Sequence, residues 1–377
     1  MKVLFITNIP SPYRVDFFNE LGRYCQLTVA FERKSARDRD EKWQADEFHS
    51  FETIFMKGKE VGADASLDLQ VISIIQRGYD IIILGGYSSP TYVIAMEYMK
   101  VKRIPFIMNA DGGFVKKDRK LLYAVKHHLI SSPTAWLSTG KMTDAYLMHY
   151  GANEKKIYRY PFSSVKFSEC VLPTEQERCE KKRLLNMAEE KVIITVGQFI
   201  PRKGIDLLIR CAPLLRYGIG LYIIGGNPSQ EYYRLAKRSG GTSIYFEGFK
   251  NRNELKDFYI AADVFAFPTR EDIWGLVLNE AMAYGLPCVA SERAISANEM
   301  VESGINGYLV NPDNLDIMAG RLNSLLENDE MRLKMGKNAY NTAQKYTIET
   351  MAECHMNIFR KILFEWKTGT DLNGKRD

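Results

Sequence analysis

The sequence predicts an α/β protein made of two doubly wound domains, and two features of the 377-residue chain point to this fold class. First, short apolar runs of strand length alternate with segments of helix length, which is typical of parallel sheets covered by helices on both faces. Second, the alternation stops at a polar, charged segment and then starts again, so the chain divides into two halves of ordinary domain size. Such sheets bind ligands at the carboxyl ends of their strands, so we expect two sets of strand ends facing a cleft.

The strands of the first half are expected where β-branched and apolar residues run into a turn or a glycine. They are residues 3–6, 26–31, 80–84, 105–108 and 135–138, with a helix at about 15–24. The first domain is assigned residues 1–165.

The second half repeats this pattern without a sequence repeat. Its expected strands are 192–196, 221–224, 244–246, 264–267 and 287–290, with helices at 205–216 and 277–284. The polar segment 166–190 is interpreted as a linker, and the second domain is assigned residues 191–349. Helical patterning runs from about 316 to 366. Its last helix, about 350–366, is a candidate to pack back on the first domain, and 367–377 is expected to be a tail.

Composition excludes several classes of protein. With 46% hydrophobic and 26% charged residues, the chain is neither disordered nor fibrous. No apolar run approaches the roughly 20 residues of a membrane span, and polar residues with Pro10 follow the first strand too early for a signal peptide. The six cysteines form no CxxC pair, so we interpret them as reduced thiols. These features predict a cytoplasmic protein.

The positive charge is concentrated in the first half. Residues 1–165 hold 23 basic and 18 acidic residues, whereas the remainder holds 28 of each. Between positions 100 and 126 only Asp111 and Asp118 accompany eight basic residues: Lys100, Lys102, Arg103, Lys116, Lys117, Arg119, Lys120 and Lys126. A solvated helix face explains such a stretch, and so does an anionic partner, either a membrane surface or a phosphorylated substrate.

The most informative segment is 267–287, which predicts a strand, a glycine-containing loop, a helix and a strand. The helix N-terminus near Gly275 and Leu276 offers free N–H donors to a diphosphate. The Glu280 carboxylate can accept two hydroxyl hydrogen bonds, as a ribose diol requires. The alternative is structural, with Asp272 as the helix N-cap and Glu280 as an ordinary surface acid.

A second segment, 196–206, predicts a strand end followed by two adjacent cations before a helix. Arg202 and Lys203 are well placed there to meet phosphate oxygens, the first in a bidentate manner and the second as a point charge. The alternative is a solvated turn.

Together the two segments resemble the retaining nucleotide-sugar glycosyltransferases of family 4, the group 1 transferases, which have the GT-B fold of two Rossmann-like domains. The family carries an acidic residue, seven intervening residues and a Glu. Asp272 and Glu280 occupy these positions here, with Asp in place of the usual Glu. Residues 280–283 and 285–287 fit the same pattern, and 299–310 resembles the next block.

The segment 196–206 also fits the resemblance. Lys203 and Gly204 match the lysine–glycine pair of the family, while Gln198 stands where many members carry Arg. The likeness is strong over about 192–312 and weaker in the first half.

The resemblance implies a donor-binding second domain and an acceptor-binding first domain. Glu280 would bind ribose and Asp272 the donor sugar. Lys203, Arg202 and the N–H groups of Gly275 and Leu276 would neutralise the diphosphate. The remaining donor-side candidates are Gln198, Gly248, Phe249 and Lys250, of which the last three would line the base pocket.

In the first domain, the resemblance places Asp111 where the family often has a His near the reaction centre, followed by Gly112 and Gly113. Asp111, Lys203 and Asp272 are the catalytic candidates. The turn after the first strand carries Tyr13 and Arg14. Arg14 is a candidate for a phosphate of either substrate, or for a position in solvent.

The implied reaction is hexosyl transfer with retention, from a UDP- or GDP-linked sugar to a saccharide or lipid-linked acceptor in bacterial surface-polysaccharide (lipopolysaccharide) synthesis. The cations and helix N–H groups would stabilise the leaving diphosphate, so we expect no metal and no cofactor. Weak contact with the anionic inner face of the cell membrane is the expected consequence of the basic first half.

Two other classes stay open at this point. A nucleotide-sugar epimerase shares the architecture but needs no acceptor. A non-enzymatic nucleotide- or RNA-binding protein would use the basic surface, but the aromatic-rich pattern of such proteins is not found and the acidic pair would repel phosphates. We therefore expect no nucleic-acid partner.

Overall fold

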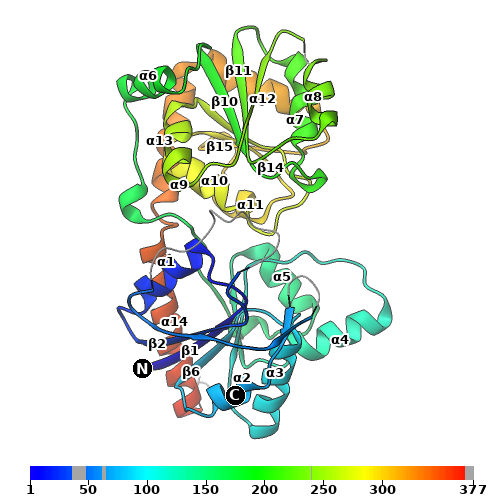
Figure 1. Cartoon of the computed structure of the whole chain (residues 1–377), viewed down its shortest axis with the longest axis vertical. Coiled ribbons are helices and arrows are strands. Elements are labelled where there is room, and N and C mark those ends of the chain that lie inside the picture. The colour runs from blue at the N-terminus through cyan, green and yellow to red at the C-terminus, as the bar shows by residue number, and fades with distance from the viewer. Residues whose placement is uncertain (36–47, 62–64, 239, 370–377) are drawn as a thin grey trace. The chain divides into compact units, whose positions relative to one another are not determined.

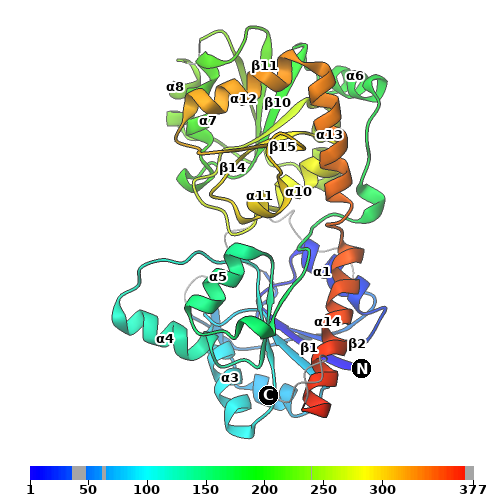
Figure 2. The same ribbon diagram turned by 180° about the vertical axis from the view of Figure 1, so that it is seen from behind.

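The structure is a computed structural model that describes residues 1–35, 48–61, 65–238 and 240–369 (Figures 1 and 2). The chain forms two compact units. The first comprises Met1–Ser164 and Thr347–Asp377, and the second comprises Val165–Tyr346. The expected tail therefore falls largely outside the described residues.

The first unit contains a seven-stranded parallel sheet in the order β3-β2-β1-β6-β7-β8-β9. Its strands are β1 (Lys2–Thr7), β2 (Gln26–Phe31), β3 (Glu52–Phe55), β6 (Ile81–Leu84), β7 (Ile107–Ala110), β8 (Ala135–Ser138) and β9 (Ile157–Arg159). The order reverses between β1 and β6, as in doubly wound folds. A separate antiparallel pair is formed by β4 (Lys59–Val61) and β5 (Ala65–Leu67).

Helices cover both faces of this sheet. They are α1 (Pro12–Leu21), α2 (Gln70–Ile75), α3 (Pro90–Lys102), α4 (Lys120–Ile130), α5 (Lys141–His149) and α14 (Ile348–Thr368). Because side chains alternate along β1, Leu4 and Ile6 enter one core with α2 and α3, whereas Phe5 packs on Phe18 of α1. The C-terminal α14 packs against α1, where the His355 and Phe17 rings lie 4.7 Å apart.

The second unit contains a six-stranded parallel sheet in the order β12-β11-β10-β13-β14-β15. Its strands are β10 (Lys191–Val196), β11 (Ile219–Ile224), β12 (Ser243–Glu247), β13 (Val264–Phe267), β14 (Cys288–Ser291) and β15 (Gly307–Val310). Its helices are α6 (Glu175–Leu184), α7 (Ile205–Cys211), α8 (Gln230–Ala236), α9 (Arg252–Ala261), α10 (Leu276–Ala283), α11 (Ile295–Met300), α12 (Leu315–Glu327) and α13 (Asp329–Ala343).

The segment 166–190 is not a free linker, which corrects the sequence-based interpretation. It contains α6, whose N-terminus is closed by a capping box of Thr174 and Glu177. The buried Arg178 of α6 donates to the carbonyl of Ala262 at the end of α9, and Lys182 lies 2.8 Å from the buried Asp263. Charged residues can hold such a segment in place because buried carbonyls and carboxylates need donors.

The sequence patterns did not delimit the helices α2, α3, α4, α5, α8, α9 and α11, nor a set of short elements. The short elements are β3, the β4–β5 pair, β9, β15 and 3₁₀ turns at Glu154–Lys156, Phe167–Glu169, Pro201–Lys203 and Ala212–Leu214. The helix expected at 205–216 ends at Cys211, and Pro213 lies in the 3₁₀ turn that follows. Among the described residues, no helix is both long and apolar enough to cross a bilayer.

Candidate functional site

Two loops lie side by side at the carboxyl edge of the second sheet, because β10 and β13 are neighbours in it. The loop after β10 carries Arg202, and the loop after β13 carries Thr269 and Arg270. The carbonyl of Arg202 accepts from the Arg270 N–H at 2.8 Å and from the Thr269 hydroxyl at 2.9 Å. These bonds place Arg202 and Lys203 of one loop next to Asp272 of the other.

Asp272 lies between the two cations. Lys203 Nζ is 2.5 Å from Asp272 Oδ2, and Arg202 Nη1 is 3.5 Å from Oδ1. The Asp272 side chain is 8% exposed, against 45% for Arg202. The backbone of Asp272 is held by Arg293 and Ile295 through bonds of 3.2 and 3.1 Å. The site therefore combines one half-exposed cation, Arg202, with one cation, Lys203, that is fixed by a buried carboxylate.

Asp272 does not cap the helix, so that structural alternative is wrong. The N-cap of α10 is Gly275, and no side chain bonds to the cap position. Gly275 has a positive φ of 85°, and a Cβ there would lie 2.4 Å from Cζ of Phe267. The glycine therefore lets the backbone turn tightly over Phe267, and α10 begins at Leu276 with first-turn N–H groups that lack an intrahelical acceptor.

Glu280 lies on α10 and is oriented by a residue that the sequence did not indicate. The Tyr259 hydroxyl donates to Glu280 Oε2 at 3.1 Å. Tyr259 is buried, and its ring stacks on that of Tyr284 with 5.6 Å between centroids. Burial and the nearby Glu280 raise the pKa of Tyr259 well above its usual value, so it stays a donor. Glu280 is half-buried and is thus more than an ordinary surface acid.

The other donor-side candidates lie at the same edge of the sheet. Gln198 and Gly248 are exposed, after β10 and β12 respectively, and Phe249 is half-buried. Lys250 is 2.9 Å from Glu247 Oε2 and lies over the Phe258 ring at 5.3 Å from its centroid. Glu247 and the Phe258 ring therefore hold the Lys250 side chain in place.

In the first unit, Arg14 does not lie in solvent, which corrects that alternative. It is buried, and its guanidinium donates to Asp111 Oδ2. Asp111 Oδ1 accepts from Asn109 at 2.7 Å and from Tyr160 at 3.0 Å. Burial opposes the charge of Arg14, but the Asp111 carboxylate outweighs it and raises the pKa of Arg14. Asp111 is thus a firmly held acceptor at the end of β7.

His355 of α14 completes this buried cluster and was not indicated by the sequence. Its Nδ1 is 2.7 Å from the Met351 carbonyl oxygen, and its ring lies 4.5 Å from that of Tyr160. Burial lowers the pKa of His355 to about 4, so the imidazole is neutral at pH 7. No sequence pattern indicates His355, because its ring partners Phe17 and Tyr160 come from distant parts of the chain.

The remaining acceptor-side candidates surround Asp111. Gly112 is half-exposed, and a Cβ on Gly113 would lie 2.5 Å from ring atoms of Tyr146. Tyr13 packs edge-on against Phe162, with ring centroids 5.8 Å apart. Gly113 is therefore needed for packing, whereas Tyr13 and Gly112 retain accessible surface.

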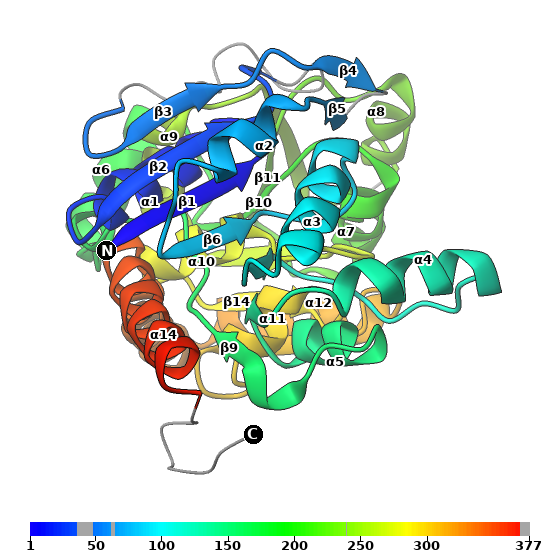
Figure 3. The same ribbon diagram turned by 90° about the horizontal axis from the view of Figure 1, so that it is seen from below.

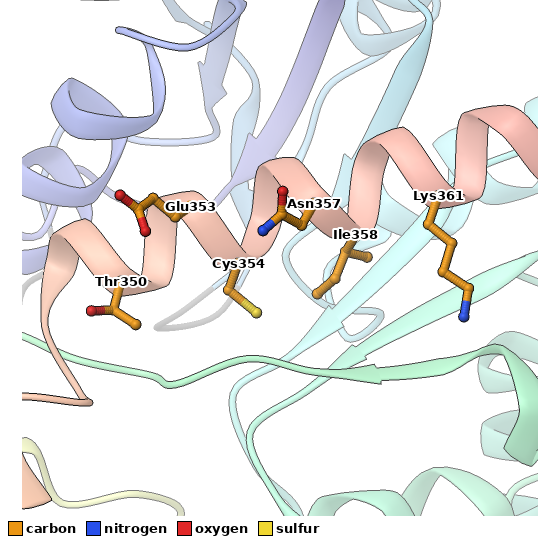
Figure 4. Close-up of a pocket in the computed structure, with 6 residues that line it drawn as sticks. All are labelled: Thr350, Glu353, Cys354, Asn357, Ile358 and Lys361. Atoms are coloured by element: carbon orange, nitrogen blue, oxygen red, sulfur yellow. The ribbon is translucent and has the colours of Figure 1, made fainter.

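Other features of the described residues bear on the chemistry. No cluster of three or more His, Cys, Asp or Glu side chains able to hold a metal occurs in the ranges that the structure describes. None of the six cysteines, all of which lie in the described ranges, forms a disulfide bond. A surface pocket of about 380 Å³ follows one side of α14, and none of the predicted site residues lines it (Figure 4). It is lined by Thr350, Glu353, Cys354, Asn357, Ile358 and Lys361.

Part of the chain, including this site, matches a known family. Residues 176–342 match the family of glycosyl transferases group 1. The matched residues include both loops described above, from Arg202 to Glu280.

Curated relatives agree with the family match. The chain is similar to an uncharacterized glycosyltransferase of Methanocaldococcus jannaschii, with 26% identity over 72% of this chain and 73% of the relative. It is also similar to a GDP-mannose-dependent α-(1-6)-phosphatidylinositol monomannoside mannosyltransferase of Mycobacterium tuberculosis, with 30% identity over 44% and 46% of the two chains. A sulfoquinovosyl transferase of Arabidopsis thaliana is 31% identical over 52% of this chain and 38% of its own length. The chain therefore spans about half or less of the last two relatives.

Solved structures show the fold. Anabaena HepE in complex with UDP superimposes with a TM-score of 0.76, 17% identity and coverage of 98% and 100% of the two chains. WaaG, a glycosyltransferase involved in lipopolysaccharide biosynthesis, gives a TM-score of 0.62 with 16% identity and coverage of 95% and 99%. The chain thus has the two-domain GT-B fold that the sequence predicted, and the comparisons together support a group 1 glycosyltransferase.

Proposed function

We propose that this chain is a retaining, metal-independent hexosyltransferase that moves a sugar from a nucleotide-sugar donor to a saccharide or lipid-linked acceptor. The observation that carries the proposal is the position of Lys203 and Arg202 around Asp272, beside the N-terminus of α10. This arrangement offers positive charge and N–H donors to a diphosphate, with a carboxylate for sugar hydroxyls next to them.

Donor binding divides between two parts of the site. Glu280, oriented by Tyr259, accepts the two ribose hydroxyl bonds, and Asp272 accepts from hydroxyls of the donor sugar. The loop of Gly248, Phe249 and Lys250 forms a wall for the base. UDP and GDP are the candidate nucleotides, supported by the UDP complex of HepE and by the GDP-mannose-dependent relative.

The chemical step breaks the bond between the sugar C1 and the diphosphate oxygen. As this bond stretches, positive charge develops on the sugar and negative charge on the leaving oxygen. Lys203 and the first-turn N–H groups of α10 stabilise the negative charge more in the transition state than in the ground state, which is what accelerates a reaction. Asp272 fixes Lys203 in place before the substrate arrives, so less reorganisation is needed.

The acceptor is proposed to bind the first unit, near Asp111. Arg14, Asn109 and Tyr160 all donate to this carboxylate, which holds it in one orientation while Arg14 balances its charge. We therefore assign Asp111 the role of a fixed hydrogen-bond acceptor for a hydroxyl of the acceptor substrate. The acceptor hydroxyl attacks C1 from the face that the diphosphate leaves and passes its proton to the departing diphosphate oxygen, so the configuration is retained.

A lipid-linked acceptor in bacterial surface-polysaccharide synthesis is the proposed substrate class. It is supported by the phosphatidylinositol monomannoside substrate named for one relative and by the lipopolysaccharide role named for WaaG. It is also consistent with the basic excess of residues 1–165. This substrate would place the enzyme at the cytoplasmic face of the membrane as a peripheral protein.

The test begins with thermal unfolding of the purified chain against a panel of UDP- and GDP-sugars, without added metal. A matching donor is expected to raise Tm, since a ligand that binds only the folded state stabilises it. That donor is then incubated with saccharide and lipid-linked acceptors, and the anomeric configuration of the product is read by NMR. Isomerised donor without transfer would instead show an epimerase, and no stabilisation by any nucleotide sugar would contradict the proposal.

A further inference from the structure

Helix α4 leaves most of its apolar side chains uncovered. Its sequence is KLLYAVKHHLI, but only Leu129 and Ile130, in its last turn, are buried. Leu121 is 79% exposed, and Leu122 and Val125 are each 48% exposed. Figure 3 shows α4 extending outward past α3 and α5. Exposed apolar residues that gather on one helix mark an interaction surface more strongly than scattered ones.

These side chains lie on one side of the helix. Residues four apart share a helical face, so Leu121 and Val125 continue toward the solvent the stripe that begins with the buried Leu129. Leu122 adjoins this stripe. The apolar face of α4 therefore runs along the whole helix, but only its C-terminal end is buried in the core.

The opposite side of α4 is attached to the first unit. Two residues along a helix turn by about 200°, so Tyr123 points away from Leu121 and Val125. The Tyr123 hydroxyl donates to the His149 carbonyl at 3.1 Å, and its ring lies 5.6 Å from that of Tyr150. Lys126 is 2.9 Å from Asp118 and lies over the Tyr150 ring. The exposed stripe is thus held in a fixed direction.

Positive charge accompanies the stripe at its N-terminal end. Lys117, Arg119 and Lys120 are exposed, and in the part of the chain that the structure describes no ion pair engages any of them. The sequence of α4 itself contains no acidic residue, and Asp118 is occupied by Lys126 and by the Tyr150 hydroxyl. The charges that remain for a partner are therefore cationic.

We propose that α4 is an interfacial membrane helix, which inserts Leu121, Leu122 and Val125 among the acyl chains of an anionic phospholipid bilayer while Lys117, Arg119 and Lys120 meet the headgroup phosphates. An 11-residue helix is about 16 Å long, so it lies in the interface and does not span the bilayer. Exposed leucines beside cations, on a helix without acidic residues, match the acyl chains and the anionic headgroups of such a bilayer. The proposal deepens the acceptor assignment above, because it would bring the first unit to a lipid-linked substrate.

The cations and the apolar side chains of α4 predict different dependences of membrane binding on salt concentration. Each cation at an anionic surface contributes about fivefold in partition coefficient, or ~1 kcal/mol. Electrostatic attraction weakens as the Debye length falls from about 10 Å at 0.1 M to 3 Å at 1 M salt, whereas burial of apolar side chains persists. Binding through α4 should therefore decrease with salt without vanishing.

Co-sedimentation of the full chain with vesicles tests this directly, with no donor or acceptor present. Wild-type protein is expected to bind vesicles of phosphatidylcholine with phosphatidylglycerol, and to bind pure phosphatidylcholine vesicles weakly. Leu121→Gln with Val125→Gln should reduce binding at least tenfold at low and at high salt. Neutralising Lys117, Arg119 and Lys120 to Gln should reduce it on the order of 100-fold at low salt only.

A matched control lies on α13 of the second unit, where Leu333, Lys334 and Lys337 are also exposed. Changing these three residues to Gln should leave vesicle binding unchanged. Tm and nucleotide-sugar affinity in solution should be the same for all variants, which separates this proposal from the proposed transfer reaction. Equal vesicle binding by wild type and the Leu121/Val125 variant would overturn the proposal. So would a dimer, seen by light scattering, that this variant dissociates without any vesicle binding by the wild type.

Discussion

Lys203 Nζ lies 2.5 Å from Asp272 Oδ2, although 69 residues separate them in the sequence. Each side chain had been predicted as a separate ligand of the donor. Their contact means that Asp272 positions the cation that meets the diphosphate, in addition to any contact with the sugar. A buried carboxylate that already holds a lysine is a preorganised group, which is the arrangement that catalysis by electrostatic stabilisation requires.

Lys203→Ala is expected to lower kcat about 100-fold or more, with a smaller effect on donor affinity, because the charge acts mainly as the leaving oxygen becomes negative. Lys203→Arg should keep part of the rate. Steady-state kinetics measure both, with the exposed Lys345→Ala as the matched control. EDTA should not inhibit the wild type. Strong inhibition by EDTA, or a Lys203→Ala enzyme of normal kcat, would contradict the assignment.

Glu280→Gln should weaken nucleotide-sugar binding about tenfold or more, because charge-assisted hydrogen bonds contribute roughly 1.5–3 kcal/mol. Tyr259→Phe should weaken it only a few-fold, since it removes the group that orients Glu280 and leaves the carboxylate in place. Calorimetric titration measures both affinities. Glu327→Gln, an exposed change on α12, is the control. Unaltered affinity in a folded Glu280→Gln protein would exclude the ribose role.

Gly275→Ala should destabilise the second unit more than Gly304→Ala does. Both glycines have a φ of 85°, so both changes carry the strain of a left-handed residue, about 1 kcal/mol or more. Only at Gly275 would the new Cβ also meet another group, 2.4 Å away on the Phe267 ring, whereas nothing lies within 4 Å at Gly304. Urea unfolding should show an additional loss of about 1–3 kcal/mol at Gly275. Equal losses would show that the contact relaxes without cost.

His355 should make the first unit less stable in mild acid. Its pKa is lowered by burial to about 4 in the folded state, against about 6.5 when unfolded, so the unfolded chain binds more protons between these values. The free energy of unfolding therefore falls as pH decreases through this window, by about 2 kcal/mol between pH 7 and pH 5. His355→Leu should remove this contribution. Denaturant unfolding at the two pH values measures the difference, and an identical pH dependence in both proteins would contradict it.

The elements around the candidate site were predictable because their signals are local. The strand at 264–267 and the start of α10 are defined by an apolar run, by Gly275 and by helix formers within about twenty residues. The linker prediction failed for the opposite reason. Residues 166–190 are polar along the sequence, but α6 is held by Arg178 and Lys182 against α9 and Asp263, more than 80 residues away.

The same distinction separates residue identity from residue role. Lys203, Asp272 and Glu280 were indicated by spacing and by resemblance, whereas Tyr259 and His355 were not, because the groups they contact come from other elements. Arg14 was indicated as a charged residue, but its burial against Asp111 was not. The contact joins residues that lie 97 positions apart, so no local pattern indicates it.

The sequence by itself determined the fold class, the order of most strands and helices, and the set of residues that carry charge at the strand ends. These depend on periodicity, glycine and proline placement, and short-range spacing, which act between neighbours in the chain. Only the tertiary structure decided which charges neutralise one another and which apolar face of α4 stays uncovered. Those outcomes depend on contacts between residues far apart in sequence, and burial strengthens such contacts because little water remains to screen them.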